Sequence, residues 1–210
     1  MNYNDLGKYK GTHAMFGASQ YSWINYPDPK MIIEKYKSKK AADFGTKIHE
    51  IAAKLITLCK KLPKSYPAIR LLLIYALGYD TELITDIVMD TLRMYVNDAI
   101  GFGMDAEQLV FYSEYFYGTA DAISMSETKS LLRIHDLKTG KTPARLEQLL
   151  IYAAYYCLQH DKDPRDLFFE LRIYQQGDVI IGRPTAAELT PLMNKIITFN
   201  KVIQEYESER

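Results

Sequence analysis

Residues 131–142 read LLRIHDLKTGKT. Its apolar first half is typical of a buried strand, which ends in two charged residues before a short turn. Because strand side chains alternate, Asp136 and Lys138 project from one face about 7 Å apart, and Leu137 points into the core. Charged groups are rarely buried unless they are paired. The pattern therefore predicts either a structural ion pair or an active site.

The same acid–x–lysine spacing occurs at 28–30 and at 127–129. The first copy contains a proline in an irregular segment, so no strand can aim its side chains. The second lies in a polar link between two predicted strands and is expected to be turn surface. Only the copy at 136–138 ends an apolar strand, which singles it out.

Strand patterns lie on both sides of this stretch. We expect three strands at 109–118, 119–124 and 130–138, and a hairpin formed by 167–175 and 178–184. Helical patterns occupy the rest, at about 30–40, 43–62, 66–77, 80–100, 143–160 and 185–210, after a short helix closed by Pro27 and Pro29. This order predicts one α/β domain over 1–210, with a mixed central β-sheet flanked by helices. Residues 1–105 would form its mainly helical part and 106–210 its sheet-containing core.

Cys59 and Cys157 lie in apolar helical patterns and have no nearby partner cysteine. Cys59 belongs to a stripe at helical spacing that Pro63 would end, formed by Ile48, Ile51, Ala52, Leu55, Ile56, Cys59 and Leu62. We therefore expect two reduced core cysteines and a cytosolic protein. The first residues, MNYNDLGKYKG, contain no apolar core, so we expect no secretory signal, and no apolar run approaches the roughly 20 residues of a membrane span.

The formal net charge is zero, but the charges are unevenly distributed. Residues 1–70 carry 13 Lys and Arg against 5 Asp and Glu, whereas 71–128 carry 1 against 10. The basic third could contact phosphates, although a charge run is more often a solvated helix face.

A second acid favours the active-site interpretation. Asp121 lies between two alanines on the preceding predicted strand. If 119–125 and 131–138 pair as a hairpin, Asp121 and Asp136 meet at one rim of the sheet. Two such carboxylates repel one another unless a proton or a cation neutralises them, and Mg²⁺ or Mn²⁺ suits oxygen ligands. Lys138 beside them could stabilise charge on a phosphate.

Four segments then carry a family resemblance: GTKIHE (45–50), GTADAI (118–123), HDLKTGK (135–141) and QLLIYA (148–153). In this order and spacing, the set resembles the RecB-like branch of the PD-(D/E)XK nuclease superfamily, which includes Cas4-type and phage recombination exonucleases. The match covers 45–153, about half of the chain, and FGASQYSWINYP is a weaker echo of the family's first segment.

The resemblance implies a restriction-endonuclease-like core and a metal-dependent DNA exonuclease. Asp121, Asp136, His49 and the backbone carbonyl of Leu137 would hold the metal, and Lys138 would be the catalytic lysine. From the helix pattern alone, His49 would be an ordinary core or capping histidine. Its place in a matched segment makes it a ligand in this interpretation.

The resemblance also implies side chains that hold DNA. Gln148 and Tyr152 share one helix face, four residues apart, although this could be an ordinary helix surface. The remaining candidates are two phosphate contacts, Lys141 and Arg145, with Lys47 weaker, and two acids behind the metal site, Glu114 and Glu50.

The expected cofactor is Mg²⁺ or Mn²⁺. Two separated cysteines cannot hold the iron–sulfur cluster of some relatives, and the chain has no GxxxxGK[ST] loop for ATP. The expected partners are DNA with a free end and a recombination or replication protein, with no membrane. An oligomer is compatible with the family, as is a bacterial or phage-encoded cytoplasmic protein.

Three alternatives stay open. The chain could be a nuclease-like module that binds DNA or a protein without cutting it, or a structural protein in which Asp136 and Lys138 close a strand. It could also be an endonuclease of the same superfamily, which would cut DNA that has no end.

Overall fold

The computed structural model describes residues 14–78 and 82–209. The segment MNYNDLGKYKG lies outside this described part. The chain divides into two compact units, Met1–Phe44 and Gly45–Arg210. All the residues of the candidate site lie in the second unit. Within the described residues, no helix has both the length and the apolar character needed to cross a membrane.

The first unit contains the short helix that the prolines predicted, the 3₁₀ helix η2 (Ala18–Asn25). The next helix corrects the sequence expectation, because the segments at 30–40 and 43–62 form one helix, α1 (Met31–Thr57). Residues 41–44 contain neither proline nor glycine, so nothing in the backbone interrupts the helix there. It also ends before Pro63, and Cys59 adopts a positive φ of 52° just beyond it.

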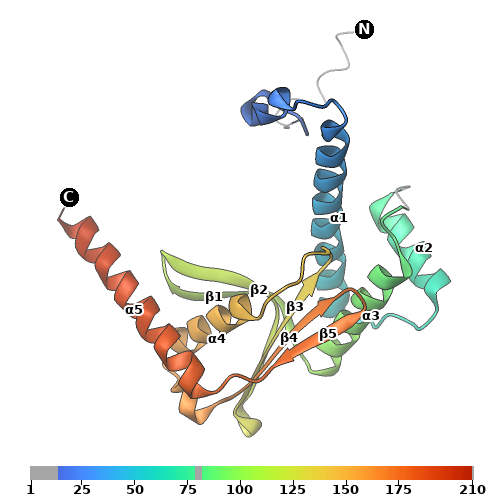
Figure 1. Ribbon diagram of the computed structural model, residues 1–210. Helices are drawn as coiled ribbons and strands as arrows, with labels where there is room; N and C mark the ends of the chain where they lie inside the picture. The colour runs from blue at the N-terminus through green and yellow to red at the C-terminus, as the bar shows by residue number, and fades with distance from the viewer. Residues whose placement is uncertain (1–13, 79–81, 210) are drawn as a thin grey trace, which may run out of the picture. The chain divides into compact units, whose positions relative to one another are not determined.

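Five strands form one mixed sheet, which confirms the predicted fold class (Figure 1). The strand order is β1-β2-β3-β4-β5, with β3 and β4 parallel and every other neighbouring pair antiparallel. The strands are β1 (Asp105–Ser113), β2 (Phe116–Ser126), β3 (Leu131–Lys138), β4 (Phe168–Gln175) and β5 (Asp178–Gly182).

The boundaries of the first hairpin differ from those expected. The predicted strand 109–118 is split by a turn at Glu114 and Tyr115, and β1 starts earlier, at Asp105. The turn contains no glycine, proline or asparagine, so the sequence gives no signal for it. The link at 127–129 is the turn that we expected, the 3₁₀ helix η3 (Glu127–Lys129).

The later helices also begin later than predicted. The helix expected at 80–100 is α3 (Asp86–Gly101), where the Thr85 hydroxyl accepts a hydrogen bond from the Val88 amide at 3.3 Å. The helix expected from Pro143 is α4 (Glu147–Gln159). The remaining helices are α2 (Tyr66–Leu77), the 3₁₀ helix η4 (Pro164–Asp166) and α5 (Ala186–Ser208), which contains Pro191.

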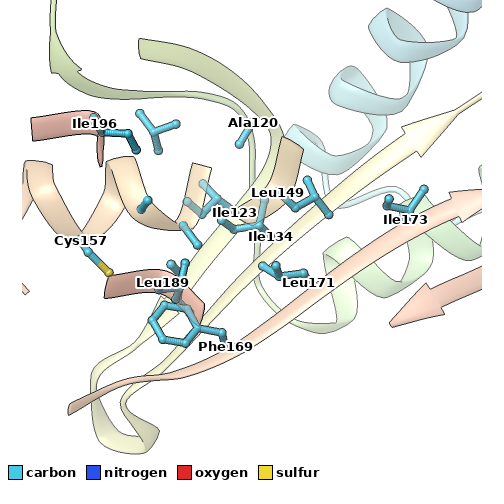
Figure 2. Packing of buried hydrophobic residues seen from close by; sticks show 14 residues of the cluster. Ala120, Ile123, Ile134, Leu149, Cys157, Phe169, Leu171, Ile173, Leu189 and Ile196 are labelled. Atoms are coloured by element: carbon cyan, nitrogen blue, oxygen red, sulfur yellow. The ribbon is translucent and has the colours of Figure 1, made fainter. Parts of the chain in front are cut away.

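The main core lies between one face of the sheet and the helices α4 and α5 (Figure 2). Ile134 of β3 and Leu171 of β4 are fully buried in it, together with Leu149 of α4 and Leu189 of α5. Cys157 lies in this core, as predicted. The same prediction was wrong for Cys59, which is exposed because α1 ends before it.

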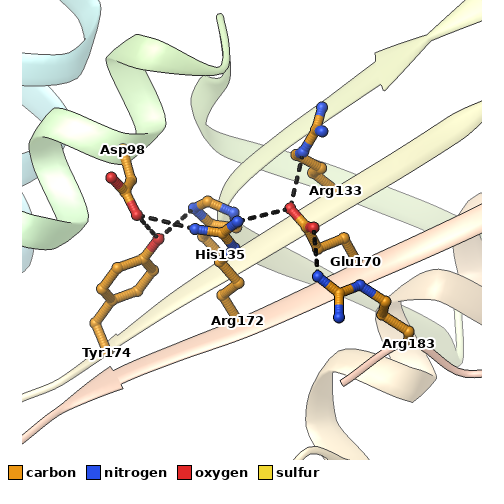
Figure 3. Close-up of polar contacts among 7 residues, drawn as sticks. All are labelled: Asp98, Arg133, His135, Glu170, Arg172, Tyr174 and Arg183. Carbon is orange, nitrogen blue, oxygen red and sulfur yellow. Dashed lines mark hydrogen bonds and ion pairs between the residues drawn. The ribbon is translucent and has the colours of Figure 1, made fainter. Parts of the chain in front are cut away.

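The opposite face of β3 and β4 carries a polar network next to the end of α3 (Figure 3). Glu170 accepts hydrogen bonds from Arg133 Nε and Arg172 at 3.0 Å each, and one from Arg183 at 3.4 Å. The guanidinium groups of Arg133 and Arg172 lie 4.4 and 4.7 Å from the ring centre of Phe102. Glu170 is 9% exposed, so its charge depends on these arginines for compensation.

The network continues toward α3 through a second carboxylate. Asp98 accepts hydrogen bonds from Arg172 at 3.0 Å and from the Tyr174 hydroxyl at 2.7 Å. The Tyr174 hydroxyl lies 3.3 Å from His135 Nδ1. Burial and the nearby arginine charges lower the pKa of His135 to about 3, so this imidazole is neutral. His135 and Asp136 therefore project from opposite faces of β3 into very different surroundings.

Candidate metal centre

Asp121 lies where β2 and β3 separate. The pairing between these strands ends at Ala122 and His135. Beyond that point, the backbone amide of Leu137 donates to Asp121 Oδ2 at 2.9 Å instead of to a strand carbonyl. The Asp121 carboxylate thus takes the place of a backbone carbonyl of the neighbouring strand as the hydrogen-bond acceptor, and this hydrogen bond restricts the orientation of its side chain. This contact confirms that the two strands meet near the rim, as the sequence predicted.

Glu107 stands opposite Asp121 across the β1–β2 hairpin, because the pairs Ala106–Ala122 and Gln108–Ala120 flank this position. Its φ of 51° lies in the left-handed region, which costs a residue other than glycine about 1–3 kcal/mol. Strain of this kind concentrates at functional sites. The sequence interpretation missed Glu107 because it started β1 after this residue.

His49 completes a group that could hold a metal ion. Its Nδ1 lies 3.2 Å from Asp121 Oδ2, and one ligand atom each from His49, Glu107 and Asp121 lie within 4.8 Å of one another. The buried Ile48 and Ala52 fix the helix face next to it, and the His49 side chain stays 29% exposed. A ligand could therefore reach the group from solvent.

Asp136 and Lys138 lie beside this group and form the ion pair that strand alternation allowed. Lys138 Nζ is 3.0 Å from both carboxylate oxygens of Asp136 and donates its hydrogen bond to Oδ1. Oδ2 is buried and accepts no hydrogen bond from any residue in the described part of the chain. Its contact in the described part of the chain is the ion pair with the Lys138 ammonium group, so a ligand or a water molecule could still supply a hydrogen bond or coordination to this oxygen.

The electrostatics of the cluster favour a bound cation. Burial and the negative charge of Asp121 raise the pKa of Asp136 to about 6, although Lys138 opposes this change. Burial and the same charge raise the pKa of Glu107. Burial disfavours protonation of His49, but the hydrogen bond to Asp121 and the charges of Asp121 and Asp136 outweigh it and raise the pKa of His49. Asp121 therefore repels both Glu107 and Asp136, and a divalent cation would relieve this repulsion.

The donor set fits the expected ion. One imidazole nitrogen and two carboxylates suit a divalent metal that accepts both nitrogen and oxygen, and the imidazole favours Mn²⁺ over Mg²⁺. The carboxylate of Asp136, which is paired with Lys138, lies close enough to Asp121 and His49 to interact with their charges. Two of the predicted ligands, His49 and Asp121, belong to the group that could hold a metal ion. The third, Asp136, is next to this group but is not part of it.

A chain of hydrogen bonds links Lys138 to the helix after it. Lys138 donates to Gln148 Oε1 at 3.1 Å, and Gln148 Nε2 donates to the Tyr152 hydroxyl at 3.1 Å. The ring of Tyr152 lies against Gly118 of β2, where an added Cβ would come within 2.7 Å of Tyr152 Cε1. Gly118 thus lets Tyr152 approach the strand. The hydrogen bonds hold the ammonium group of Lys138 between Asp136 and Gln148.

Replacing Gly118 with alanine tests this arrangement. The new methyl group would displace the Tyr152 ring, and we expect a loss of about 1–3 kcal/mol in the free energy of unfolding, as for other overpacked sites. Urea denaturation measures this loss. The double variant Gly118→Ala/Tyr152→Leu removes the clashing ring and should recover part of it. No recovery would mean that Gly118 acts through another contact.

The other predicted residues are placed as follows. Lys47, Glu50, Lys141 and Arg145 are exposed. Glu114 lies in the turn at the tip of the hairpin, just before β2 begins at Phe116. Asp121 is five residues further along β2 than Phe116, which corresponds to roughly 16 Å along a strand. The structure therefore does not bring Glu114 to the metal centre, and Glu107 from the same hairpin lies there instead.

No protein-family model, no curated protein and no solved structure matches this chain.

Proposed function

We propose that this chain is a Mg²⁺- or Mn²⁺-dependent deoxyribonuclease that hydrolyses phosphodiester bonds from DNA ends, similar to the RecB-like branch of the PD-(D/E)XK superfamily. One observation carries the proposal. The group formed by His49, Glu107 and Asp121 lies beside a buried carboxylate and a lysine, Asp136 and Lys138. Acids that can hold a divalent cation, with one ammonium group beside them, suit the hydrolysis of an anionic substrate once that cation is bound.

Each part of the cluster has a distinct task in this reaction. His49, Glu107 and Asp121 would hold the ion, which supplies Lewis-acid stabilisation of the scissile phosphate and lowers the pKa of a water molecule. Lys138 donates to the oxygen on which negative charge develops, since its ammonium group already lies at the edge of the cluster. Asp136 fixes that ammonium group from one side.

Gln148 and Tyr152 are the proposed contacts to the DNA strand. They extend the hydrogen-bond chain from Lys138 along one face of α4, so a strand bound there would lie next to the ammonium group. Lys141 and Arg145 lie in the exposed segment just before this helix and are the proposed phosphate contacts. A role in recombination, repair or replication, in a bacterium or its phage, completes the proposal.

The test uses linear DNA labelled at its ends and covalently closed circular DNA, with Mg²⁺, with Mn²⁺ and with EDTA. We expect label to be lost from linear DNA only in the presence of a metal, while circular DNA stays intact. Cleavage of the circle would instead identify an endonuclease, and intact linear DNA with a folded protein would contradict the proposal.

The matching variant is Lys138→Ala, which should lower the cleavage rate by about 10²–10³-fold, the usual effect of removing a group that stabilises transition-state charge. Lys129→Ala is its control. Lys129 has the same acid–x–lysine spacing but lies exposed in the η3 turn, so its removal should leave the rate unchanged. Equal rates for both variants would place the chemistry elsewhere.

A further inference from the structure

An exposed apolar strip lies on one face of the β1–β2 hairpin. Phe111 and Tyr117 are cross-strand partners whose rings stack with centres 5.8 Å apart, and they are 41% and 58% exposed. Leu109, the next residue on this face of β1, is 54% exposed. We refer to Leu109, Phe111 and Tyr117 as the aromatic strip. Contiguous exposed apolar side chains of this kind often mark a binding surface.

The strip points away from the core. Val110 and Tyr112 of β1 pack into the cluster that includes α4, as does Phe116 of β2. Because strand side chains alternate, Phe111 and Tyr117 face the opposite side of the hairpin. Ser113 Oγ donates to Asn200 of α5 at 2.6 Å, so the tip of the hairpin is anchored. The two rings are therefore presented on a fixed support.

The strip leads directly to the metal centre. Along the register, Phe111 pairs with Tyr117, Leu109 pairs with Thr119, and Glu107 stands opposite Asp121. Four residues separate Phe111 from Glu107, which corresponds to about 13 Å along the strand. That length is about four stacked nucleotides at 3.4 Å each.

A groove continues this path beyond the metal centre. It has a volume of about 400 Å³. Its lining consists of Ala106 and Glu107 of β1, Ala53, Lys54 and Thr57 of α1, and Leu58 directly after α1. Along β1, the residues of the aromatic strip come after Glu107, whereas Ala106, which lines the groove, comes before it. An extended chain that crosses the metal centre would therefore find an aromatic surface on one side and a groove on the other.

The charges on the hairpin show which part of a nucleic acid the strip suits. Residues 105–121 contain four acids, Asp105, Glu107, Glu114 and Asp121, and no lysine or arginine. A metal ion held by Glu107 and Asp121 would compensate the charges of these two acids, but Asp105 and Glu114 would still repel a phosphate backbone lying along the rest of the hairpin. The uncharged π-faces of bases are the part of a nucleic acid that two exposed aromatic rings attract.

We propose that the aromatic strip is a base-stacking platform for the single-stranded end of a nucleic acid, holding it about four nucleotides from the bond that is cut. This inference rests on the proposed function for the position of the cut, but it makes a prediction about binding that does not depend on cleavage. Bases stack on Phe111 and Tyr117, and the backbone approaches the hairpin only at the metal centre.

The test measures the binding of fluorescein-labelled oligothymidylates of 12 and of 3 nucleotides by fluorescence anisotropy with Mn²⁺. The measurements use the Lys138→Ala background, in which cleavage is suppressed. Adding Phe111→Ala and Tyr117→Ala should weaken binding of the 12-mer by about tenfold or more and leave binding of the 3-mer unchanged. Phe111→Trp with Tyr117→Trp should preserve binding. Tyr75→Ala is the matched control, because Tyr75 is 92% exposed on α2.

Equal affinity of the alanine variant and its background for the 12-mer would overturn the platform, and so would a lack of binding by the background. A loss of self-association in sedimentation, with DNA binding unchanged, would overturn it in favour of a protein-docking surface. The two proposals can fail separately. If the wild type does not cleave DNA but its 12-mer binding depends on the rings, the proposed function fails and the platform stands. If the wild type cleaves and ring removal changes nothing, only the platform fails.

Discussion

Replacing Asp121 with asparagine is expected to lower the rate of metal-dependent DNA cleavage by on the order of 10³-fold. Asparagine has the same shape, and its carbonyl oxygen can still accept the hydrogen bond from the Leu137 amide. The variant should therefore fold, but it removes the negative charge at the centre of the group formed with His49 and Glu107. Initial rates on end-labelled linear DNA measure the effect.

Metal binding gives the same variant a readout that needs no cleavage. Saturating Mn²⁺ should raise the unfolding temperature of the wild type, since a ligand at 100 times its dissociation constant stabilises a folded protein by about 2.7 kcal/mol. The Asp121→Asn variant should lose most of this shift. Asp105→Asn is the control, because Asp105 is an exposed acid on the same hairpin and pairs with Ile123. An equal Mn²⁺ shift in the wild type and in Asp121→Asn would place the ion elsewhere.

Replacing Glu170 with alanine is expected to lower the free energy of unfolding by about 3 kcal/mol. Arg133 and Arg172 are each 15% exposed and share the Glu170 carboxylate, so its removal leaves buried positive charge without compensation. Arg172 would keep its ion pair with Asp98. The expected loss is therefore at the lower end of the range of about 3–5 kcal/mol that is typical when one partner of a buried ion pair is removed. Urea denaturation measures the change.

The matched control for Glu170→Ala is Glu205→Ala. Glu205 forms an exposed pair with Lys201 at 3.7 Å, and exposed pairs contribute about 0–1 kcal/mol. A loss for Glu170→Ala no larger than that of the control would mean that water compensates the arginines.

The Glu170 effect should also depend on pH. Burial disfavours its ionised form, but the hydrogen bonds and charges of Arg133 and Arg172 outweigh burial and lower the pKa of Glu170 from its ordinary value of 4.5. A carboxyl group with a lowered pKa in the folded chain contributes stability above pH 4.5, and this contribution is lost as the pH falls through the lowered pKa. The stability difference between the wild type and Glu170→Ala should therefore shrink in acid. A difference that is constant from pH 7 to pH 3 would contradict the ionic role.

Local patterns were sufficient to predict the centre of the sheet and the acids at its rim. The strand ending in Asp136 and Lys138 is strongly apolar, and period-two alternation alone brings the two charged groups to one face, where they form the expected pair. The same reasoning placed Asp121 next to this strand. These features depend on residues close together in the sequence, which is where pattern reasoning is most reliable.

The features that were missed depend on contacts that are distant in the sequence or on rare backbone geometry. Glu107 reaches the metal centre through the register of a hairpin whose turn carries no signal, and it does so with a positive φ that no sequence rule predicts for glutamate. Cys59 fits the apolar stripe of α1, but the helix ends at Thr57 and leaves it exposed. A periodic apolar pattern does not indicate the residue at which a helix ends.

The amide of Leu137 gives the metal centre a further property. Because Asp121 is held by this hydrogen bond, much of the rotational freedom of its side chain is lost when the chain folds, so a cation that arrives later need not supply that ordering entropy. Oxygen ligands fixed in this way cannot readily move outward to surround a wider ion. The centre should therefore discriminate among divalent cations by ionic radius, with Ca²⁺ bound more weakly than Mn²⁺ or Mg²⁺.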